Sequence, residues 1–396
     1  MNGLAAVMPP ISDREMKVVD AARAFARDVI EPHAGAWEEA GSVPREAFRE
    51  AAARGLCRLA VPESMDGHGL GMPAMALVVE ALAAACMASA FALTVHNNLA
   101  RGITRSATPA QLERWLPGLI AGEQISAFLL TEPQGGSDAA AITTIARRDG
   151  RDWRLDGAKA WVSNAATADL LSVYAQTDAS SGWRGIACFI VAADAPGVIR
   201  EPAYRLLGGH ALGTGGFRFE GCRVSADDVL VGPGDGFKAA LAGVDFARIT
   251  VAAMCCGMLG RSLQVALEHG AGRRTFGKSV LEHQAVQTLL ADAATDLEAA
   301  RLLTARAATV LDDGTGRHTL AAAHAKKFAT RVALSRIADC MQAMGANGFR
   351  TTYPLARHLS AAKMAQYLDG TTEIQNVVIG RAITRPYLSA AGQTGC

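Results

Sequence analysis

Three short segments hold residue types that could bind an anion or move a proton. Gly135, Gly136 and Ser137 follow one another in LLTEPQGGSD, and adjacent glycines allow a tight turn at which the backbone can approach a phosphate. Arg273, in GRRTFGKSVLEHQAVQ, carries a guanidinium whose paired donors match phosphate oxygens. Asp369, in KMAQYLDGTTEIQ, could cap the helix expected after it. No glycine-rich run has the GxGxxG spacing between a strand and a helix, so a Rossmann site is not indicated.

The elements that must position these segments come in the order helices, strands, helices. Ser12-Asp13 precedes apolar residues at helical spacing, which predicts an N-terminal α-helical domain over residues 1–124. Short runs that alternate β-branched or aromatic residues with polar ones predict an antiparallel, β-barrel-like domain over 125–232. Alanine-rich helical periodicity then predicts a C-terminal helical bundle over 233–396, with breaks at 312–314 and 345–354. The predicted fold class is mainly α with a β domain.

Composition narrows the possible partners. The formal net charge is only +1 over 396 residues, which does not favour nucleic acid and leaves a small molecule as the expected partner. The N-terminus lacks the pattern of a signal peptide, so we expect a cytoplasmic protein. The apolar stretch 74–95 is long enough to span a bilayer, but it is mostly alanine and leads into His96-Asn97-Asn98. A buried helix fits it better than a membrane span.

The cysteines do not suggest a metal or a disulfide framework. None of them has CxxC or Cys/His spacing, so we expect buried, reduced thiols and no metal site. The eight positions are Cys57, Cys86, Cys188, Cys222, Cys255, Cys256, Cys340 and Cys396.

Four blocks of the sequence resemble the acyl-CoA dehydrogenase family. The first is LLTEPQGGSD with DGAKAWVSNAATAD (156–169), the second is GRRTFGKSVLEHQAVQ, the third is CMQAMGANGFRTTYPLAR (340–357) and the fourth is KMAQYLDGTTEIQ. The resemblance implies an FAD enzyme in which Leu130 and Thr131 face the flavin pyrimidine, Trp161 packs against the ring and Ser163 donates to flavin N5. Ser137 is implied to contact the cofactor or the thioester arm. Taken alone, these two segments could instead be β-turns beside a buried tryptophan.

The next two blocks imply a cofactor shared between subunits. By resemblance, their residues reach an FAD that is bound mainly by a neighbouring subunit, so a homodimer or homotetramer is expected. The implied cofactor-binding residues are Arg273, Thr275, Phe276, Gln284, Gln342, Gly345 and Ala346. Ala346 stands where the family often has glycine. The alternative for the first of these blocks is a solvated basic helix end.

The fourth block carries the chemistry. Family members usually have Tyr-Glu-Gly-Thr here, and that Glu removes the substrate α-proton; this chain has Asp369 instead. The resemblance assigns Gly370 to the substrate, and Thr371 and Glu373 to the cofactor. An aspartate carboxylate lies about 1.5 Å nearer its backbone than a glutamate carboxylate. Some branches keep the base on an earlier helix, but that position is Ala247 in this chain. A role for Asp369 as a helix cap alone is the alternative.

Substrate positions follow from the same resemblance. Asp245 and Arg248 are implied to line the CoA channel, although both could be surface charges on a helix. His96 adds polarity to a wall of the acyl pocket, although a core histidine fits equally well. Ala90 stands where relatives that bind a second substrate carboxylate have arginine, which disfavours a dicarboxylic acyl group.

We therefore expect dehydrogenation of an acyl-CoA, or a related acyl thioester such as an acyl-carrier thioester, to the trans-2-enoyl product. Asp369 would act as base, and flavin N5 would accept the hydride. An electron-transfer flavoprotein is the expected acceptor, and fatty acid metabolism the expected context. One alternative is a flavoprotein oxidase or monooxygenase, since nitroalkane oxidases have Asp at this position, but they follow it with an arginine where this chain has Asn376. Another is a catalytically silent flavin- or CoA-binding protein.

Overall fold

The computed structural model describes residues 4–314 and 316–391. They fall into two compact units. Unit 1 comprises Met1–Ile11, Met72–Ala84 and Asp245–Cys396, and unit 2 comprises Ser12–Gly71 and Ala85–Val244, each as far as it is described. The predicted three-domain order follows the chain, whereas these units group the helix at Met72–Ala84 with the C-terminal helices. Cys396 lies outside the described residues.

Unit 2 begins with helices, and the first of them, α1, starts with a capping box. Ser12 Oγ accepts from the Glu15 amide at 3.3 Å and Glu15 Oε2 accepts from the Ser12 amide at 3.1 Å, as the Ser12-Asp13 signal predicts. The helices of this unit are α1 (Asp13–Phe25), α2 (Glu31–Ala40), α3 (Arg45–Ala53), α5 (Met87–Ser106) and α6 (Pro109–Ile120), with a π-helical turn at Ala26–Ile30 between α1 and α2.

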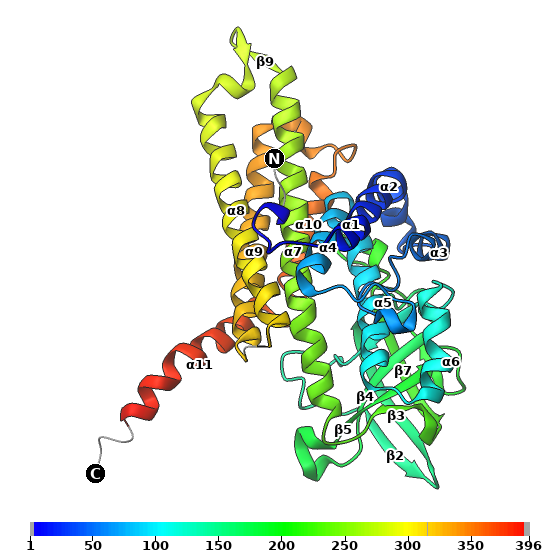
Figure 1. Cartoon of the computed structure of the whole chain (residues 1–396). Coiled ribbons are helices and arrows are strands. Elements are labelled where there is room, and N and C mark those ends of the chain that lie inside the picture. The colour runs from blue at the N-terminus through cyan, green and yellow to red at the C-terminus, as the bar shows by residue number, and fades with distance from the viewer. Residues whose placement is uncertain (1–3, 315, 392–396) are drawn as a thin grey trace. The chain divides into compact units, whose positions relative to one another are not determined.

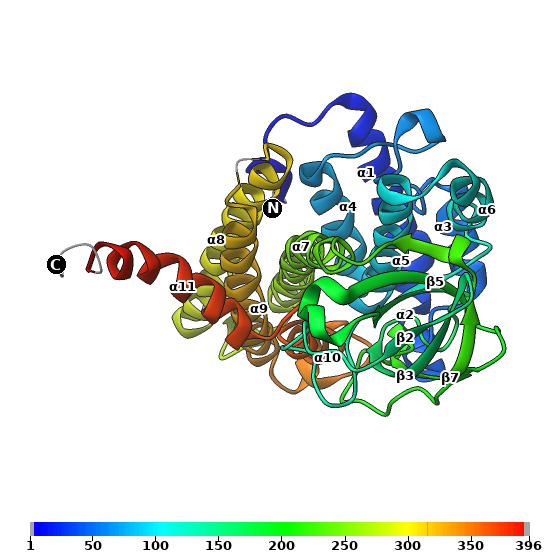
Figure 2. The ribbon, with the colours of Figure 1, turned by 90° about the horizontal axis from the view of Figure 1, so that it is seen from below.

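The middle of the chain forms one sheet in the strand order β6-β7-β3-β2-β4-β5-β8, with β1 beside β4. Strands β2, β3, β5 and β7 of this sheet are labelled in Figure 2. Its strands are β1 (Ser126–Leu129), β2 (Ile145–Asp149), β3 (Asp152–Val162), β4 (Leu170–Gln176), β5 (Ile186–Ala192), β6 (Val198–Arg200), β7 (Gly215–Val224) and β8 (Val229–Val231). Most pairs are antiparallel, as predicted, but β1 and β2 run parallel to β4.

Strand β4 is buried along its whole length because both faces of the sheet are covered. On one face, Leu171 and Val173 pack into a core made by the sheet itself. On the other, Tyr174 packs with Ile103 of α5 and Trp115 of α6. A strand with two covered faces loses the regular alternation of apolar and polar residues, and β4 (LLSVYAQ) is accordingly apolar except at Ser172 and Gln176.

Unit 1 is a helical bundle in which α8 and α9 lie side by side (Figure 1). Its helices are α4 (Met72–Ala85), the greater part of α7 (Gly236–Gly272), α8 (Gln284–Asp312), α9 (His318–Ala343), α10 (Leu355–Ala365) and α11 (Thr372–Ala391). A two-stranded hairpin, β9 (Arg274–Thr275) and β10 (Lys278–Ser279), joins α7 to α8. The predicted breaks are present, because α8 ends at Asp312 and a short 3-10 helix spans Gly345–Phe349.

One expectation about the helices needs correction. The apolar stretch 74–95 is two helices rather than one, because Cys86 is extended, with φ −161° and ψ 117° between α4 and α5. Among the described residues, α7 alone is long and apolar enough to cross a membrane, and 72% of its apolar window is buried within the protein. That burial is typical of a core helix. All seven cysteines in the described chain are free and buried, as predicted.

Candidate active site and flavin-contacting segments

Two loops of unit 2 carry the residues predicted to contact flavin. Thr131 follows β1 and Trp161 lies near the end of β3, where Thr131 O accepts from the Ala160 amide at 3.0 Å. Trp161 has a left-handed backbone, with φ 57°, and its side chain is 61% exposed. A large exposed aromatic residue in a disfavoured conformation is typical of a ligand contact. The alternative of a buried tryptophan is therefore wrong.

These loops offer free polar groups to a ligand. Within the described residues, neither the Thr131 nor the Ser163 hydroxyl has a hydrogen-bond partner, and Ser163 is only 9% exposed. Leu130 is buried beside them, and Ser137 is exposed in the glycine turn. Unused donors next to an exposed indole fit the edge and face of a flavin, which needs donors where negative charge develops on reduction. The residues present therefore fit FAD.

The predicted base lies in unit 1 on a two-residue loop, Asp369–Gly370, which we call the base loop. Both residues have positive φ, 52° for Asp369 and 92° for Gly370, so the loop needs support from its neighbours. Lys326 of α9 donates to Gly370 O at 2.6 Å, and Gln375 of α11 donates to the same oxygen at 2.9 Å. Arg248 of α7 donates to Asp369 O at 3.0 Å. Three helices thus fix the loop through its backbone carbonyls.

The Asp369 carboxylate, unlike the backbone carbonyl of the same residue, has an oxygen that accepts no hydrogen bond in the described chain. The residue is half-buried, yet this oxygen, Oδ2, is shielded from solvent. Burial raises the pKa of Asp369 to about 6, against the opposing effect of the Lys326 and Arg248 charges. A carboxylate with a pKa near neutrality and a free oxygen is suited to accept a proton.

Two structural alternatives at this site are wrong. Helix α11 begins at Thr372, so Asp369 is too far ahead of it to be its N-cap. Asp245 and Arg248 are each only 7% exposed rather than surface charges. They pair at 2.9 Å, and Asp245 also accepts from the Thr319 hydroxyl at 2.5 Å. The structure thus ties this pair to the base loop.

Sequence reasoning missed Lys326. Its side chain has no exposed surface, and burial lowers its pKa to about 8, although the Asp369 charge acts the other way. In the sequence it is one of two adjacent lysines in an alanine-rich helix. The available signal was its helical register, since Lys326 falls on the same face as the buried Ala322, Ala329 and Ala333.

The residues assigned to a shared cofactor lie on the surface of unit 1. Phe276, at the tip of the β9–β10 hairpin, is 98% exposed and has φ 49°, followed by Gly277 with φ 81°. Two left-handed residues make the tight turn that two-residue hairpins favour. The other exposed members are Arg273, Gln284, Gln342, Gly345, Ala346 and Glu373, while Thr275 and Thr371 are partly buried.

His96 is placed as a core histidine. It has no exposed surface, its Nε2 lies 2.9 Å from Leu119 O, and its ring packs edge-on against Phe48. Burial lowers its pKa to about 4, so it is neutral at pH 7. This placement argues against direct contact with a substrate and favours the structural alternative.

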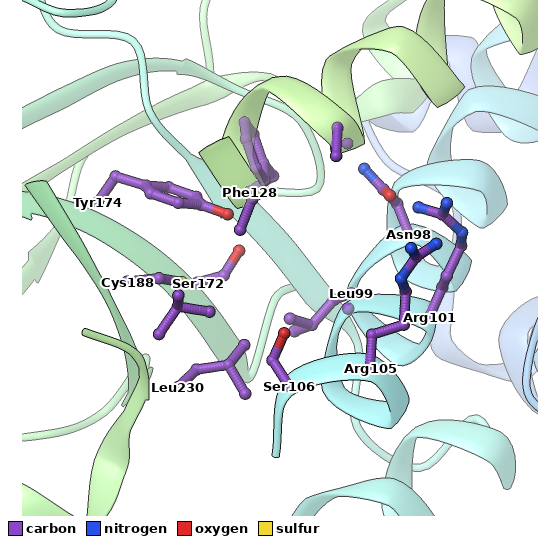
Figure 3. A pocket seen from close by; sticks show the side chains of 15 residues that line it. Asn98, Leu99, Arg101, Arg105, Ser106, Phe128, Ser172, Tyr174, Cys188 and Leu230 are labelled. Carbon is purple, nitrogen blue, oxygen red and sulfur yellow. The ribbon is translucent and has the colours of Figure 1, made fainter. Parts of the chain in front are cut away.

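A cavity in unit 2 opens between α5, the sheet and the first turns of α7 (Figure 3). Its described lining combines Asn98, Leu99, Arg101, Gly102, Arg105 and Ser106 with Phe128, Ser172, Tyr174, Cys188, Leu230, Val231, Ala239, Ala242 and Gly243. None of the predicted site residues is among them.

Comparison with known proteins gives consistent matches along the chain. Models of the N-terminal, middle and C-terminal domains of acyl-CoA dehydrogenase match residues 12–123, 127–222 and 234–384. The short-chain specific acyl-CoA dehydrogenase of human mitochondria is 33% identical over 380 residues, which cover 96% of this chain and 92% of that protein.

Solved structures agree with these matches. Butyryl-CoA dehydrogenase from Megasphaera elsdenii aligns with a TM-score of 0.90 at 32% identity, over 95% of this chain and 99% of that one. A glutaryl-CoA dehydrogenase from Mycobacterium smegmatis, solved in complex with FADH2, aligns with a TM-score of 0.89 at 27% identity, over 94% and 95% of the two chains.

Proposed function

The chain belongs to the acyl-CoA dehydrogenase family, and on that premise we propose that Asp369 is the base that removes the α-proton of its acyl-CoA substrate. The protein is an FAD-dependent oxidoreductase acting on acyl-CoA. The observation that carries the proposal is the free Oδ2 of Asp369 on a loop held by Lys326 and Arg248.

Proton removal by Asp369 needs an ionised carboxylate in a dry site. A pKa of about 6 leaves most of the carboxylate ionised at pH 7 while keeping it basic enough to take the weakly acidic α-proton. As that proton moves to Oδ2, the hydrogen on Cβ leaves with its electron pair and a trans-2,3 double bond forms. Bound FAD supplies the acceptor for this hydride at N5.

The unit 2 loops would hold the cofactor. The free hydroxyls of Thr131 and Ser163 are available to donate to the flavin, and the exposed Trp161 offers an aromatic face. The Leu130–Thr131 backbone would face the pyrimidine edge, where fixed donors stabilise the reduced form without reorganisation.

Exposed apolar residues support assembly into a homodimer or homotetramer. Ile383, Tyr387 and Leu388 are 59%, 79% and 71% exposed on the distal part of α11 (Figure 1), and Phe276 is exposed on its hairpin. Apolar side chains grouped on one helix are typical of a subunit interface. Light scattering after size exclusion tests the subunit number.

We further propose a cytoplasmic enzyme of fatty acid metabolism that passes electrons to an electron-transfer flavoprotein.

The test is anaerobic mixing of the purified holoprotein with acyl-CoAs from short to long while the flavin absorbance is followed. We expect bleaching with one member of the series, and bleaching at least about a hundredfold slower with Asp369→Asn, which should retain FAD. Bleaching at close to the wild-type rate in Asp369→Asn would exclude Asp369 as the base. Rapid oxygen consumption with peroxide release would instead identify an oxidase.

A further inference from the structure

A second buried ion pair lies directly behind the flavin-contacting loops. Lys159 of β3 and Glu132 have side chains that are 0% and 1% exposed, and Lys159 Nζ lies 2.7 Å from Glu132 Oε1. Lys159 Nζ also donates to Leu130 O at 3.0 Å. Lys159 is two residues from Trp161, and Glu132 directly follows Thr131. The pair therefore joins the two segments that are proposed to contact the flavin.

The Glu132 carboxylate gathers further donors around this pair. Oε2 accepts from the Thr143 amide at 2.6 Å, the Thr143 hydroxyl at 2.8 Å and Gln134 Nε2 at 2.6 Å, while Oε1 accepts from the Thr144 amide at 2.8 Å. Burial alone would raise the pKa of Glu132, but Lys159 and these donors lower it to about 2. Burial lowers the pKa of Lys159 to about 8 despite Glu132, so both groups are charged at pH 7.

Such a pair is costly to bury, and it is not needed to fill space, because apolar residues of similar size often serve as well or better. Its position gives it a specific role. We propose that Lys159 and Glu132 are positioning residues of the FAD site, which fix the spacing of its two loops and whose balanced charges set the midpoint potential of the bound flavin. The proposal rests on the flavin contacts assigned above to Thr131 and Trp161.

The charges predict effects of opposite sign. Reduction places additional negative charge on the flavin. Lys159→Met leaves the Glu132 carboxylate uncompensated, which disfavours that charge and should lower the midpoint potential. Glu132→Gln leaves the Lys159 ammonium uncompensated and should raise it. A purely structural defect would loosen the loops in both variants and would not invert the sign.

The experiment measures FAD affinity and midpoint potential by chemical reduction against reference dyes. Each single variant is compared with wild type at the same pH over a series from pH 6 to pH 8, so that any pH at which the remaining group has lost its charge shows as a loss of the potential shift. We expect the dissociation constant for oxidised FAD to rise at least tenfold in both. We also expect opposite potential shifts of about 30 mV, which corresponds to a tenfold change in the ratio of affinities for oxidised and reduced FAD in a two-electron couple.

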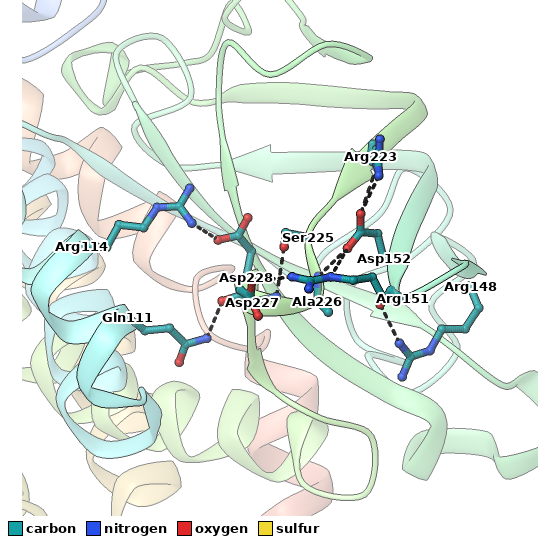
Figure 4. A network of polar contacts seen from close by, with 10 residues as sticks. All are labelled: Gln111, Arg114, Arg148, Arg151, Asp152, Arg223, Ser225, Ala226, Asp227 and Asp228. Carbon is teal, nitrogen blue, oxygen red and sulfur yellow. Dashed lines mark hydrogen bonds and ion pairs between the residues drawn. The ribbon is translucent and has the colours of Figure 1, made fainter.

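The matched control is Asp152→Asn, at the other end of β3. Asp152 is 8% exposed and accepts from Arg223 Nη2 at 2.8 Å and from the Ala226 amide at 3.2 Å, in the network of Figure 4. It lies about 23 Å from Lys159 along the strand. Its loss should affect folding stability but leave FAD affinity and midpoint potential within twofold and about 10 mV of wild type.

Shifts of the same sign in both single variants, unchanged potentials, or equal shifts in Asp152→Asn would overturn the proposal. If a single variant does not fold, the double variant Lys159→Met/Glu132→Gln, which leaves no unpaired charge, decides. It should bind FAD at least tenfold more weakly than Asp152→Asn, and wild-type affinity would overturn the proposal. Chemical reduction needs no acyl-CoA, so the result is independent of whether any acyl-CoA bleaches the flavin.

Discussion

Replacing Lys326 by methionine should move the pH dependence of flavin reduction by acyl-CoA to higher pH. The rate should follow the ionised fraction of Asp369, because only the carboxylate can accept the α-proton. Burial raises the pKa of this group to about 6, and the Lys326 ammonium opposes that rise. The wild-type rate should therefore fall as the pH drops through about 6. Without the Lys326 ammonium, burial raises the pKa of Asp369 further, so the midpoint of the pH dependence must move to higher pH.

The size of the expected shift follows from the typical effect of a nearby charge on the pKa of a carboxyl group. An opposite charge within about 4–6 Å lowers a carboxyl pKa by about one to three units, so its loss should raise the pKa of Asp369 by about one unit or more. At pH 6 the ionised fraction would fall from about one half to about one tenth, a loss of about fivefold. Near pH 8.5 the ionised fraction of the variant should be nearly complete again.

Anaerobic stopped-flow bleaching between pH 5 and 9 measures both quantities. Lys326 also donates to Gly370 O at 2.6 Å, so a lower plateau would report loss of loop positioning, while the midpoint reports the charge. Lys327→Met, which changes the adjacent lysine on α9, is the control and should leave the midpoint unchanged. A midpoint in Lys326→Met that stays at the wild-type value or moves down would refute the electrostatic reasoning.

Three other outcomes are expected. Asp369→Asn should slow bleaching by about 10²–10⁴-fold without loss of FAD, and a smaller effect in stopped-flow mixing would argue against general-base catalysis. Glu80→Gln should lower the free energy of unfolding by about 3 kcal/mol in urea titrations, because Arg301 Nη2 pairs with Glu80 Oε1 at 2.9 Å in the interior of unit 1; a change within experimental error would contradict this. Phe276→Ala should weaken FAD binding in a calorimetric titration, because the ring is 98% exposed in the single chain and is available to a ligand; unchanged FAD affinity would remove Phe276 from the cofactor site.

Sequence reasoning was sufficient where local signals decide the structure. Ser12 caps α1 because a hydroxyl three residues before a glutamate satisfies free amides locally, and the Asp-Asp-Gly break at 312–314 ends α8. The order of helices, strands and helices follows from periodicity. The break at Cys86 between α4 and α5 could not be predicted, since neither proline nor glycine marks the extended residue.

The candidate site was predictable only in part. Asp369 was accessible through its motif, but a motif does not reveal that its carboxylate oxygen would be buried and unpartnered. Lys326 and Lys159 look like ordinary polar positions in the sequence. Their importance comes from burial beside acids and carbonyls distant along the chain, such as Gly370, 44 residues away from Lys326. Helical register indicates that Lys326 is buried, but it does not reveal which distant groups the charge contacts.

The buried thiols allow local opening of the structure to be measured by alkylation. Unit 2 carries Cys57 and Cys188, and unit 1 carries Cys255 and Cys340; burial raises the pKa of each of these thiols to about 12. Because the thiolate is the reactive form, alkylating reagents can label these positions only after the surrounding structure opens. Mass spectrometry of labelled peptides over time would therefore show which unit opens first, without any probe being introduced.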